Sequence, residues 1–90
     1  KTLWFRQVYV PQIIAGTKTH TARRPSSRLP RAGEIVALSV GPRPPFARAR
    51  VTSVETREWD ELSPAKRSEL QALGIDSGPI CWIEFVVLPA

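Results

Sequence analysis

Residues 10–23 have the sequence VPQIIAGTKTHTAR, in which two local patterns meet at a glycine. Pro11 suits the first position of a helix and Gly16 suits the left-handed position just after one, so residues 10–16 are predicted to form a short helix. Threonines alternate with other side chains over residues 17–23, which is typical of a strand. The chain is therefore expected to pass from a short helix directly into a strand.

The rest of the chain divides into short segments between turns, and further strands are expected at residues 3–5, 34–40, 46–55 and 80–88. A second helix is expected from Pro64 to Gly74, with Ser63 as its N-cap. One face of the strand at 46–55 is expected to carry Ala47, Ala49, Val51 and Ser53. Because tight turns rather than long helical crossovers join the strands, we predict a mainly β (α+β) fold, a small closed barrel of about five to six strands with two short helices.

The length and composition limit the possible architectures and sites. Ninety residues with 42% hydrophobic and 23% charged side chains make one globular domain, residues 1–90. Cys81 and His20 are the only residues of their kinds. They exclude an internal disulfide, a Cys/His zinc site and a Ser-His-Asp or Cys-His catalytic site of the usual build. We expect no metal and no cofactor.

The same composition predicts the cellular location of the protein. The lack of a disulfide framework in so small a domain predicts an intracellular, cytoplasmic location. No apolar run reaches the roughly 18 residues that span a membrane, and no signal-peptide pattern opens the chain, so we expect no membrane association. A monomer is expected.

Charge is distributed unevenly along the chain. Residues 1–50 hold ten basic side chains against Glu34 alone, a net charge of +9, whereas residues 51–90 hold three basic and seven acidic ones, a net charge of −4. A positive half attracts phosphate-bearing partners. Four arginines fall within nine residues, at Arg23, Arg24, Arg28 and Arg31. They are interpreted either as a phosphate clamp for a nucleoside or RNA, or as a solubilising loop.

Residues 16–23, GTKTHTAR, resemble the motif of the ASCH domain family, in which a helix ends in Gly before Lys-Thr, a Thr two residues on and an Arg two beyond. Gly33-Glu34 ahead of a strand and Trp82-Ile83-Glu84-Phe85 in the last strand match further parts of the family pattern in the same order. ASCH domains are similar to PUA domains, small β-barrels that bind RNA. The resemblance therefore implies a PUA-like barrel.

The same resemblance implies an activity. Some small single-domain ASCH proteins of similar length are amidohydrolases of N(4)-acetylcytidine, with a catalytic Lys and Thr three residues apart and a downstream Glu. The first two match Lys18 and Thr21, and the third falls after Leu62, where Glu69 is the nearest acidic residue. Other ASCH proteins bind or cleave RNA. We therefore predict an amidohydrolase that removes the acyl group of a modified nucleoside, with an RNA-binding module and a ribonuclease as the alternatives.

The chemistry of these residues is coherent by itself. A Thr hydroxyl is a weak nucleophile and needs a base beside it, and Lys18 can be that base only if burial or nearby positive charge lowers its pKa. Arg23 and Arg24 are candidates for that charge, and Glu69 for the acid that protonates the leaving amine. In a regular strand, residues three apart point to opposite faces, so Lys18 and Thr21 can meet only if the chain bends near residues 16–19.

Three other residues have predicted roles of their own. His20 is expected on the surface of its strand, and Cys81 as a small buried hydrophobe. Trp59 is expected to plug one end of the barrel, with stacking on a nucleic-acid base as the alternative.

Overall fold

The computed structural model of the chain describes residues 1–89 and contains one sheet, two α-helices and two 3₁₀ helices. The elements are β1 (Thr2–Trp4), η1 (Gln7–Tyr9), α1 (Val10–Ile14), β2 (His20–Arg23), β3 (Ile35–Ser39), β4 (Ala47–Arg57), η2 (Trp59–Glu61), α2 (Pro64–Gln71) and β5 (Ile80–Val87). The predicted mainly β fold with two short α-helices is confirmed. No helix within these residues has the length and apolar character needed to cross a membrane.

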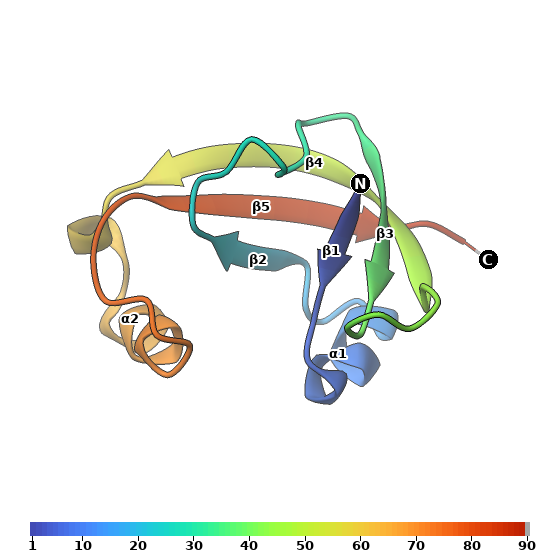
Figure 1. Cartoon of the computed structure of the whole chain (residues 1–90), viewed down its shortest axis with the longest axis horizontal. Helices are drawn as coiled ribbons and strands as arrows, with labels where there is room; N and C mark the ends of the chain where they lie inside the picture. Colours follow the sequence, from blue (N-terminus) through green and yellow to red (C-terminus); the bar gives the residue numbers. More distant parts are fainter. Residues whose placement is uncertain (90) are drawn as a thin grey trace.

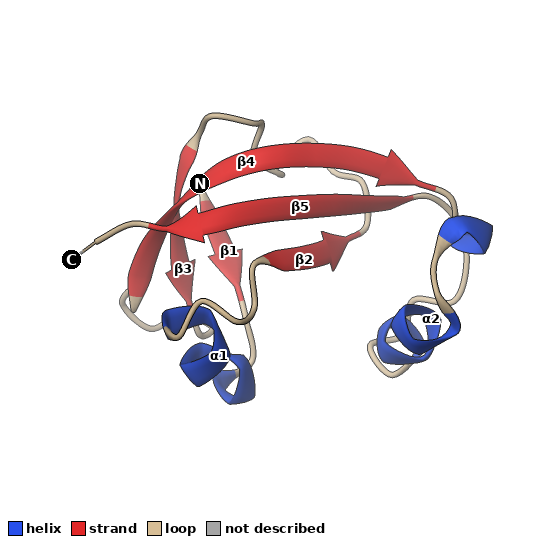
Figure 2. Cartoon of the chain, turned by 180° about the vertical axis from the view of Figure 1, so that it is seen from behind, coloured by secondary structure: helices blue, strands red, loops and turns tan. Residues whose placement is uncertain are grey.

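The five strands hydrogen-bond in the order β1-β3-β4-β5-β2, with β1 parallel to β3 and all other neighbours antiparallel. The sheet curls into a half-barrel, and α1 and α2 lie at opposite ends of the long β4–β5 ribbon (Figures 1 and 2). Full closure was expected, but the edge strands β1 and β2 are not paired with each other within residues 1–89. Instead, the Arg23 guanidinium of β2 donates a hydrogen bond to the Trp4 carbonyl of β1 and bridges the two edges.

A bulge in β4 changes which side chains face the core. Val51 lies opposite Phe85, but Ser53 lies opposite the next residue of β5, Glu84, so one extra residue stands in β4. Because an extra residue shifts the alternation of a strand by one, the face that holds Val51 continues at Val54 rather than at Ser53. Val54 packs against the core, whereas the Ser53 hydroxyl donates to the Glu84 carboxylate at 3.0 Å. The prediction that Ser53 shares a face with Val51 is therefore wrong.

Two apolar clusters hold the fold together. The larger one fills the concave side of the sheet, where Phe5 and Phe85 meet edge to face with ring centroids 6.0 Å apart. The smaller one lies under α2 and consists of Ala22, Leu62, Leu70 and Ile80. Trp59, expected to plug one end of the barrel, is half-buried just after β4 and packs against this second cluster. Strand β2 contributes Ala22 to the smaller cluster.

A large stability effect is expected at Ile83 of β5, which is fully buried in the larger cluster. Ile83→Ala should lower the free energy of unfolding by about 2–5 kcal/mol, because it removes buried methylenes and leaves a cavity. Val86 lies on the same strand but is 56% exposed, so Val86→Ala should change the free energy by less than about 0.5 kcal/mol. Urea denaturation of the two variants tests this difference; equal losses would contradict the assigned core.

Candidate functional site

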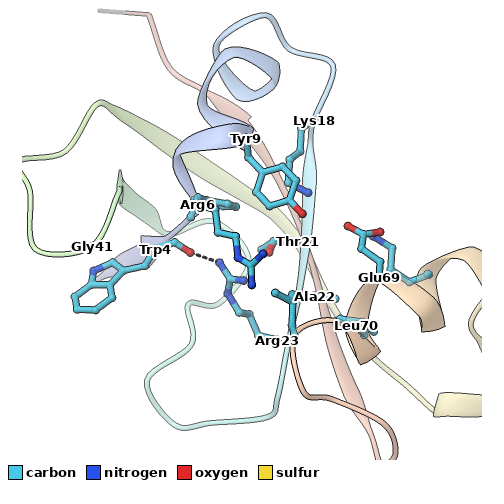
Figure 3. Close-up of a pocket in the computed structure, with 13 residues that line it drawn as sticks. Trp4, Arg6, Tyr9, Lys18, Thr21, Ala22, Arg23, Gly41, Glu69 and Leu70 are labelled. Carbon is cyan, nitrogen blue, oxygen red and sulfur yellow. Dashed lines mark hydrogen bonds and ion pairs between the residues drawn. The ribbon is translucent and has the colours of Figure 1, made fainter.

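A cavity of about 320 Å³ opens beside β2, and its wall is built by residues from β1, η1, β2 and α2. Lys18, Thr21, Arg23 and Glu69 all line it (Figure 3). These are the three residues expected to have catalytic roles and one of the four arginines expected to bind substrate. The cavity lies between the two apolar clusters, since Phe5 of the larger cluster and Leu70 of the smaller one are also in its wall.

Lys18 reaches the cavity because it precedes the strand rather than belonging to it. Gly16 has a φ of +80°, a left-handed conformation that glycine adopts without strain. The chain then folds back over the end of α1, so that the backbone N–H groups of Thr17 and Lys18 both donate to the Gln12 carbonyl, at 3.0 and 3.1 Å. Strand β2 begins only at His20. This turn is the bend that the spacing of Lys18 and Thr21 requires.

The surroundings of Lys18 disfavour its charged form. Its ammonium nitrogen lies 4.7 Å from the centre of the Tyr9 ring, a cation–π contact that by itself favours the charged form, but the side chain is half-buried. Burial lowers the pKa of Lys18 most, the positive charge of Lys66 lowers it further, Glu69 partly opposes this, and Arg23 adds a smaller decrease. Arg24 was expected to supply positive charge near Lys18, but Lys66 supplies it instead. No motif of the sequence marks Lys66.

Lys66 connects α2 to the strands. Its ammonium nitrogen lies 3.0 Å from a Glu69 carboxylate oxygen, 3.1 Å from His20 Nε2 and 5.1 Å from the centre of the Trp82 ring. His20 in turn stacks on Trp82 with ring centroids 4.5 Å apart and planes 6° from parallel. His20 was expected to be a plain surface residue; instead it is half-buried, because the register of β2 against β5 sets it diagonally beside Trp82.

Glu69 is held as a carboxylate. Its partial burial raises its pKa, but the hydrogen bond and charge of Lys66 and the charge of Lys18 outweigh this effect, so the pKa of Glu69 lies below its ordinary value. The carboxylate points from α2 toward Lys18 (Figure 3). Glu69 is consequently ionised at neutral pH, and it can donate a proton only after it has accepted one.

The four arginines of residues 23–31 do not gather at the cavity. Arg23 lines it, with its guanidinium carbon 5.1 Å from the centre of the Phe5 ring, and burial lowers its pKa. Arg24 is exposed and donates to the Gly74 carbonyl beyond α2 at 3.3 Å, while Arg28 is exposed and absent from the cavity wall. Arg31 lines a separate, shallower depression. Arg6, which no motif of the sequence marks, is the other arginine of the cavity wall.

The remaining candidate residues lie away from the cavity. Cys81 is buried in β5, as expected of a small hydrophobic side chain. Among residues 1–89, no three His, Cys, Asp or Glu side chains are grouped in a way that could hold a metal ion.

Comparison with solved structures identifies the fold. The ASCH domain of Lactobacillus crispatus JV V101 matches with a TM-score of 0.67 at 15% identity, over 96% of this chain and 77% of that one. A protein of Enterococcus faecalis V583 assigned to the DUF984 family matches with a TM-score of 0.63 at 18% identity, over 87% of this chain and 68% of that one. The chain has the fold of an ASCH domain.

This result confirms the resemblance to ASCH domains at the level of the fold. No family model matches the sequence, and no curated protein matches it. With identities below 20%, the ASCH fold alone does not specify an activity, which has to be inferred from the residues of the cavity.

The contact between His20 and Lys66 predicts a pH-dependent stability. Burial, followed by the charges of Lys66 and Lys18, lowers the pKa of His20 below its ordinary value of about 6.5. Between that value and the lowered one, the unfolded chain binds more protons than the folded one, so the free energy of unfolding should fall as the pH drops below about 6.5.

His20→Gln should remove this loss, because an amide oxygen still accepts from Lys66 but does not titrate. Denaturant unfolding at pH 8, 6.5 and 5.5 is the measurement, and His20 is the only histidine of the chain. The carboxyl groups with lowered pKa values, Glu34 and Glu69, titrate below this window. An identical pH dependence in both proteins would contradict the assignment.

Proposed function

We propose that this chain is a member of the ASCH family and an amidohydrolase that removes the acyl group of a modified nucleoside such as N(4)-acetylcytidine. The observation that carries the proposal is the presence of Lys18, Thr21 and Glu69 in the wall of one cavity, where burial and the charge of Lys66 lower the pKa of Lys18. A neutral amine beside a hydroxyl is the pair that nucleophilic attack on an amide requires.

In the first half of the proposed reaction, the Thr21 hydroxyl oxygen attacks the acyl carbonyl carbon while the Lys18 amine takes the hydroxyl proton. The tetrahedral intermediate then loses the exocyclic nitrogen of the base as its C–N bond breaks, and that nitrogen receives a proton. The products of this half are the free amino group of cytidine and an acyl ester on Thr21. Arg23, which has donors to spare beyond its bond to the Trp4 carbonyl, supports stabilisation of the oxyanion.

In the second half, a water molecule attacks the ester carbonyl and Lys18 again takes the proton. The bond to Thr21 breaks, the threonine oxygen regains a proton and the carboxylate leaves. Glu69 fits the role of a proton carrier rather than that of a resting acid: as a carboxylate facing the protonated Lys18, it accepts a proton and passes it to the leaving nitrogen. Its charge also stabilises the ammonium that Lys18 becomes.

The cavity is suited to a ligand of this size and kind. Its volume of about 320 Å³ is at the lower end of the range of small-molecule sites, roughly 300–1,000 Å³, which accommodates a nucleoside better than a larger ligand. Phe5 and Tyr9 provide aromatic surface for a base, and Arg6 and Arg23 provide hydrogen-bond donors for its oxygens or for the ribose.

Substitutions of the two central residues test the proposal. Thr21 is only 4% exposed, so it is more deeply buried than was expected for a residue near the start of a strand. Thr21→Val is therefore the best-matched variant, because it removes the hydroxyl and keeps the size of the side chain. Thr21→Val and Lys18→Met should each lower kcat/KM for N(4)-acetylcytidine by several orders of magnitude, and the double variant should be little worse, because nucleophile and base act as a unit. Release of cytidine, followed by chromatography, is the measurement.

Thr19→Val is the matched control, since Thr19 is exposed and immediately precedes β2. It should retain the activity of the unsubstituted protein. A Thr21→Val protein that keeps most of its activity would show that Thr21 is not the nucleophile.

One observation favours a second function, the binding of RNA. Trp4 is 61% exposed although it lines the mouth of the cavity, and Arg6 lies two residues further along the chain. An exposed aromatic ring and a guanidinium in the wall of one cavity can stack on an unpaired base and contact its phosphate. Arg28 and Arg31 are exposed and lie away from the cavity, so they do not form one basic surface with Arg6. RNA binding is therefore the second candidate rather than the first.

Binding of single-stranded RNA should be weaker after Trp4→Ala by about 1–3 kcal/mol, the usual contribution of one stacked base. Arg6→Gln should reduce the dependence of log K on log salt by about 0.7, the value for one phosphate contact on a single strand. Fluorescence anisotropy between 50 and 300 mM salt measures both effects. Val8→Ala, which changes an exposed apolar residue of the neighbouring η1, is the control and should bind unchanged. Affinity that does not depend on salt would argue against this function.

A further inference from the structure

Lys66 holds an unusual position for a lysine on an exposed helix. Its side chain is 14% exposed, although α2 contributes only Leu70 to the buried core. Lysine is almost never withdrawn from water unless its charge is paired. Here three groups from three elements surround the ammonium: Glu69 of α2, His20 of β2 and the ring of Trp82 of β5. The ammonium is therefore held at one place on the cavity wall.

Each of the three contacts restricts a different freedom of the side chain. Glu69 is three residues further along α2, a spacing that puts two side chains on the same face of a helix. His20 Nε2 accepts a hydrogen bond from the ammonium, so this nitrogen is the unprotonated one and the proton of the neutral ring is on Nδ1. Trp82 supplies the face of its ring at 5.1 Å and is itself fixed by stacking on His20.

We propose that Lys66 is a positioning residue for Lys18: His20 and Glu69 anchor its ammonium in the cavity wall, and the fixed positive charge favours the uncharged amine of Lys18. The role of Lys18 as a base rests on the function proposed above. The effect of the Lys66 charge on the protonation of Lys18 does not depend on that function. A mobile surface ammonium would be screened by water and salt, and so its charge would act weakly on Lys18. Anchoring in a partly buried site removes much of that screening.

The other charged groups around the two lysines do not cancel this effect. After burial itself, Lys66 is the strongest influence that lowers the pKa of Lys18, and the opposing influence of Glu69 is smaller. Arg23 of β2 acts in the same direction as Lys66. Glu84 of β5 acts on His20, and Arg57 of β4 lies over the ring of Trp82 with its guanidinium carbon 4.1 Å from the centre. Among the positive charges, that of Lys66 therefore lowers the pKa of Lys18 most.

The chain offers a direct measurement of this effect that does not depend on activity. It contains only three lysines, Lys1, Lys18 and Lys66, so lysine labelled with ¹³C at Cε gives three signals whose titration can be followed by NMR. Substitution of Lys66 removes one signal and leaves Lys18 to be compared with Lys1. The titration midpoint of Lys18 should rise in Lys66→Gln and stay close to that of the unsubstituted protein in Lys66→Arg, which retains the charge.

Arg67→Gln is the matched control. Arg67 is the next residue of α2 and also partly buried, and its substitution removes the same unit of charge from the same helix without touching the contacts of Lys66. The midpoint of Lys18 should not change in this variant. A rise of equal size in Arg67→Gln and Lys66→Gln would mean that only the net charge of the helix matters, and it would overturn the proposal.

The pH profile of the hydrolase gives the second readout. The acid limb of kcat/KM for N(4)-acetylcytidine should move to higher pH in Lys66→Gln by the same amount as the NMR midpoint, with about a tenfold loss of rate below the limb for each pH unit. A loss of rate without a move of either the limb or the midpoint would indicate a structural role and would overturn the proposal. If the unsubstituted protein does not hydrolyse the substrate but the midpoint of Lys18 still rises, the proposed function fails while the coupling between the lysines stands.

A variant of His20 keeps the proposal testable if Lys66→Gln does not fold. His20→Phe retains a ring that can stack on Trp82 but removes the acceptor of the Lys66 hydrogen bond, whereas His20→Gln keeps an acceptor. The midpoint of Lys18 should rise in His20→Phe and not in His20→Gln. An unchanged midpoint in both variants, with a native-like amide spectrum, would show that the ammonium of Lys66 is not held by His20 and would overturn the proposal.

Discussion

Strand β2 pairs with β5 over four residues, from His20 opposite Glu84 to Arg23 opposite Cys81. Side chains alternate along a strand, so this register sends Thr21 and Arg23 toward the larger core and leaves His20 on the face of Trp82 and α2. Among the strands of residues 1–89, none pairs with the other edge of β2, and β2 residues line the cavity. A slip of one residue would exchange the two faces and remove Thr21 from the cavity. The position of the candidate nucleophile thus depends on this short pairing.

The openness of the sheet is what makes room for a site. A fully closed barrel of this size fills its interior with side chains. Here the two edge strands are unpaired within residues 1–89, the Arg23 guanidinium bridges them by its bond to the Trp4 carbonyl, and Trp4 and Arg23 both line the cavity. Arg23 therefore has two roles. It bridges the edges of the sheet, and its remaining hydrogen-bond donors are available to the cavity that it lines. The two roles are connected, because closure by backbone pairing would cover Thr21.

The electrostatics of the cavity are unfavourable for folding and favourable for chemistry. Four basic side chains share its wall with a single carboxylate, Glu69: Arg6, Lys18, Arg23 and Lys66. Positive charges brought together and partly withdrawn from water destabilise one another, and the same repulsion favours the neutral amine of Lys18. Surplus positive charge around one hydroxyl is difficult to explain as a device for stability. It is readily explained if the cavity must activate a nucleophile or receive an electron-rich ligand. In this part of the fold, like charges lie close together at a cost in stability, as is typical of functional sites.

The sequence by itself determined the elements and the local part of the site. Pro11, Gly16 and Ser63 mark helix ends through their own backbone preferences, and Lys18, Thr21 and Arg23 lie within six residues, so a local motif was sufficient to group them. The tertiary structure decided the rest. Lys66 meets His20 across 46 positions of sequence, the bulge in β4 reverses the alternation beyond Val51, and the barrel stays open between β1 and β2. These features depend on strand register and on the packing of α2 against the sheet, and both are set by long-range contacts that no local pattern of residues encodes.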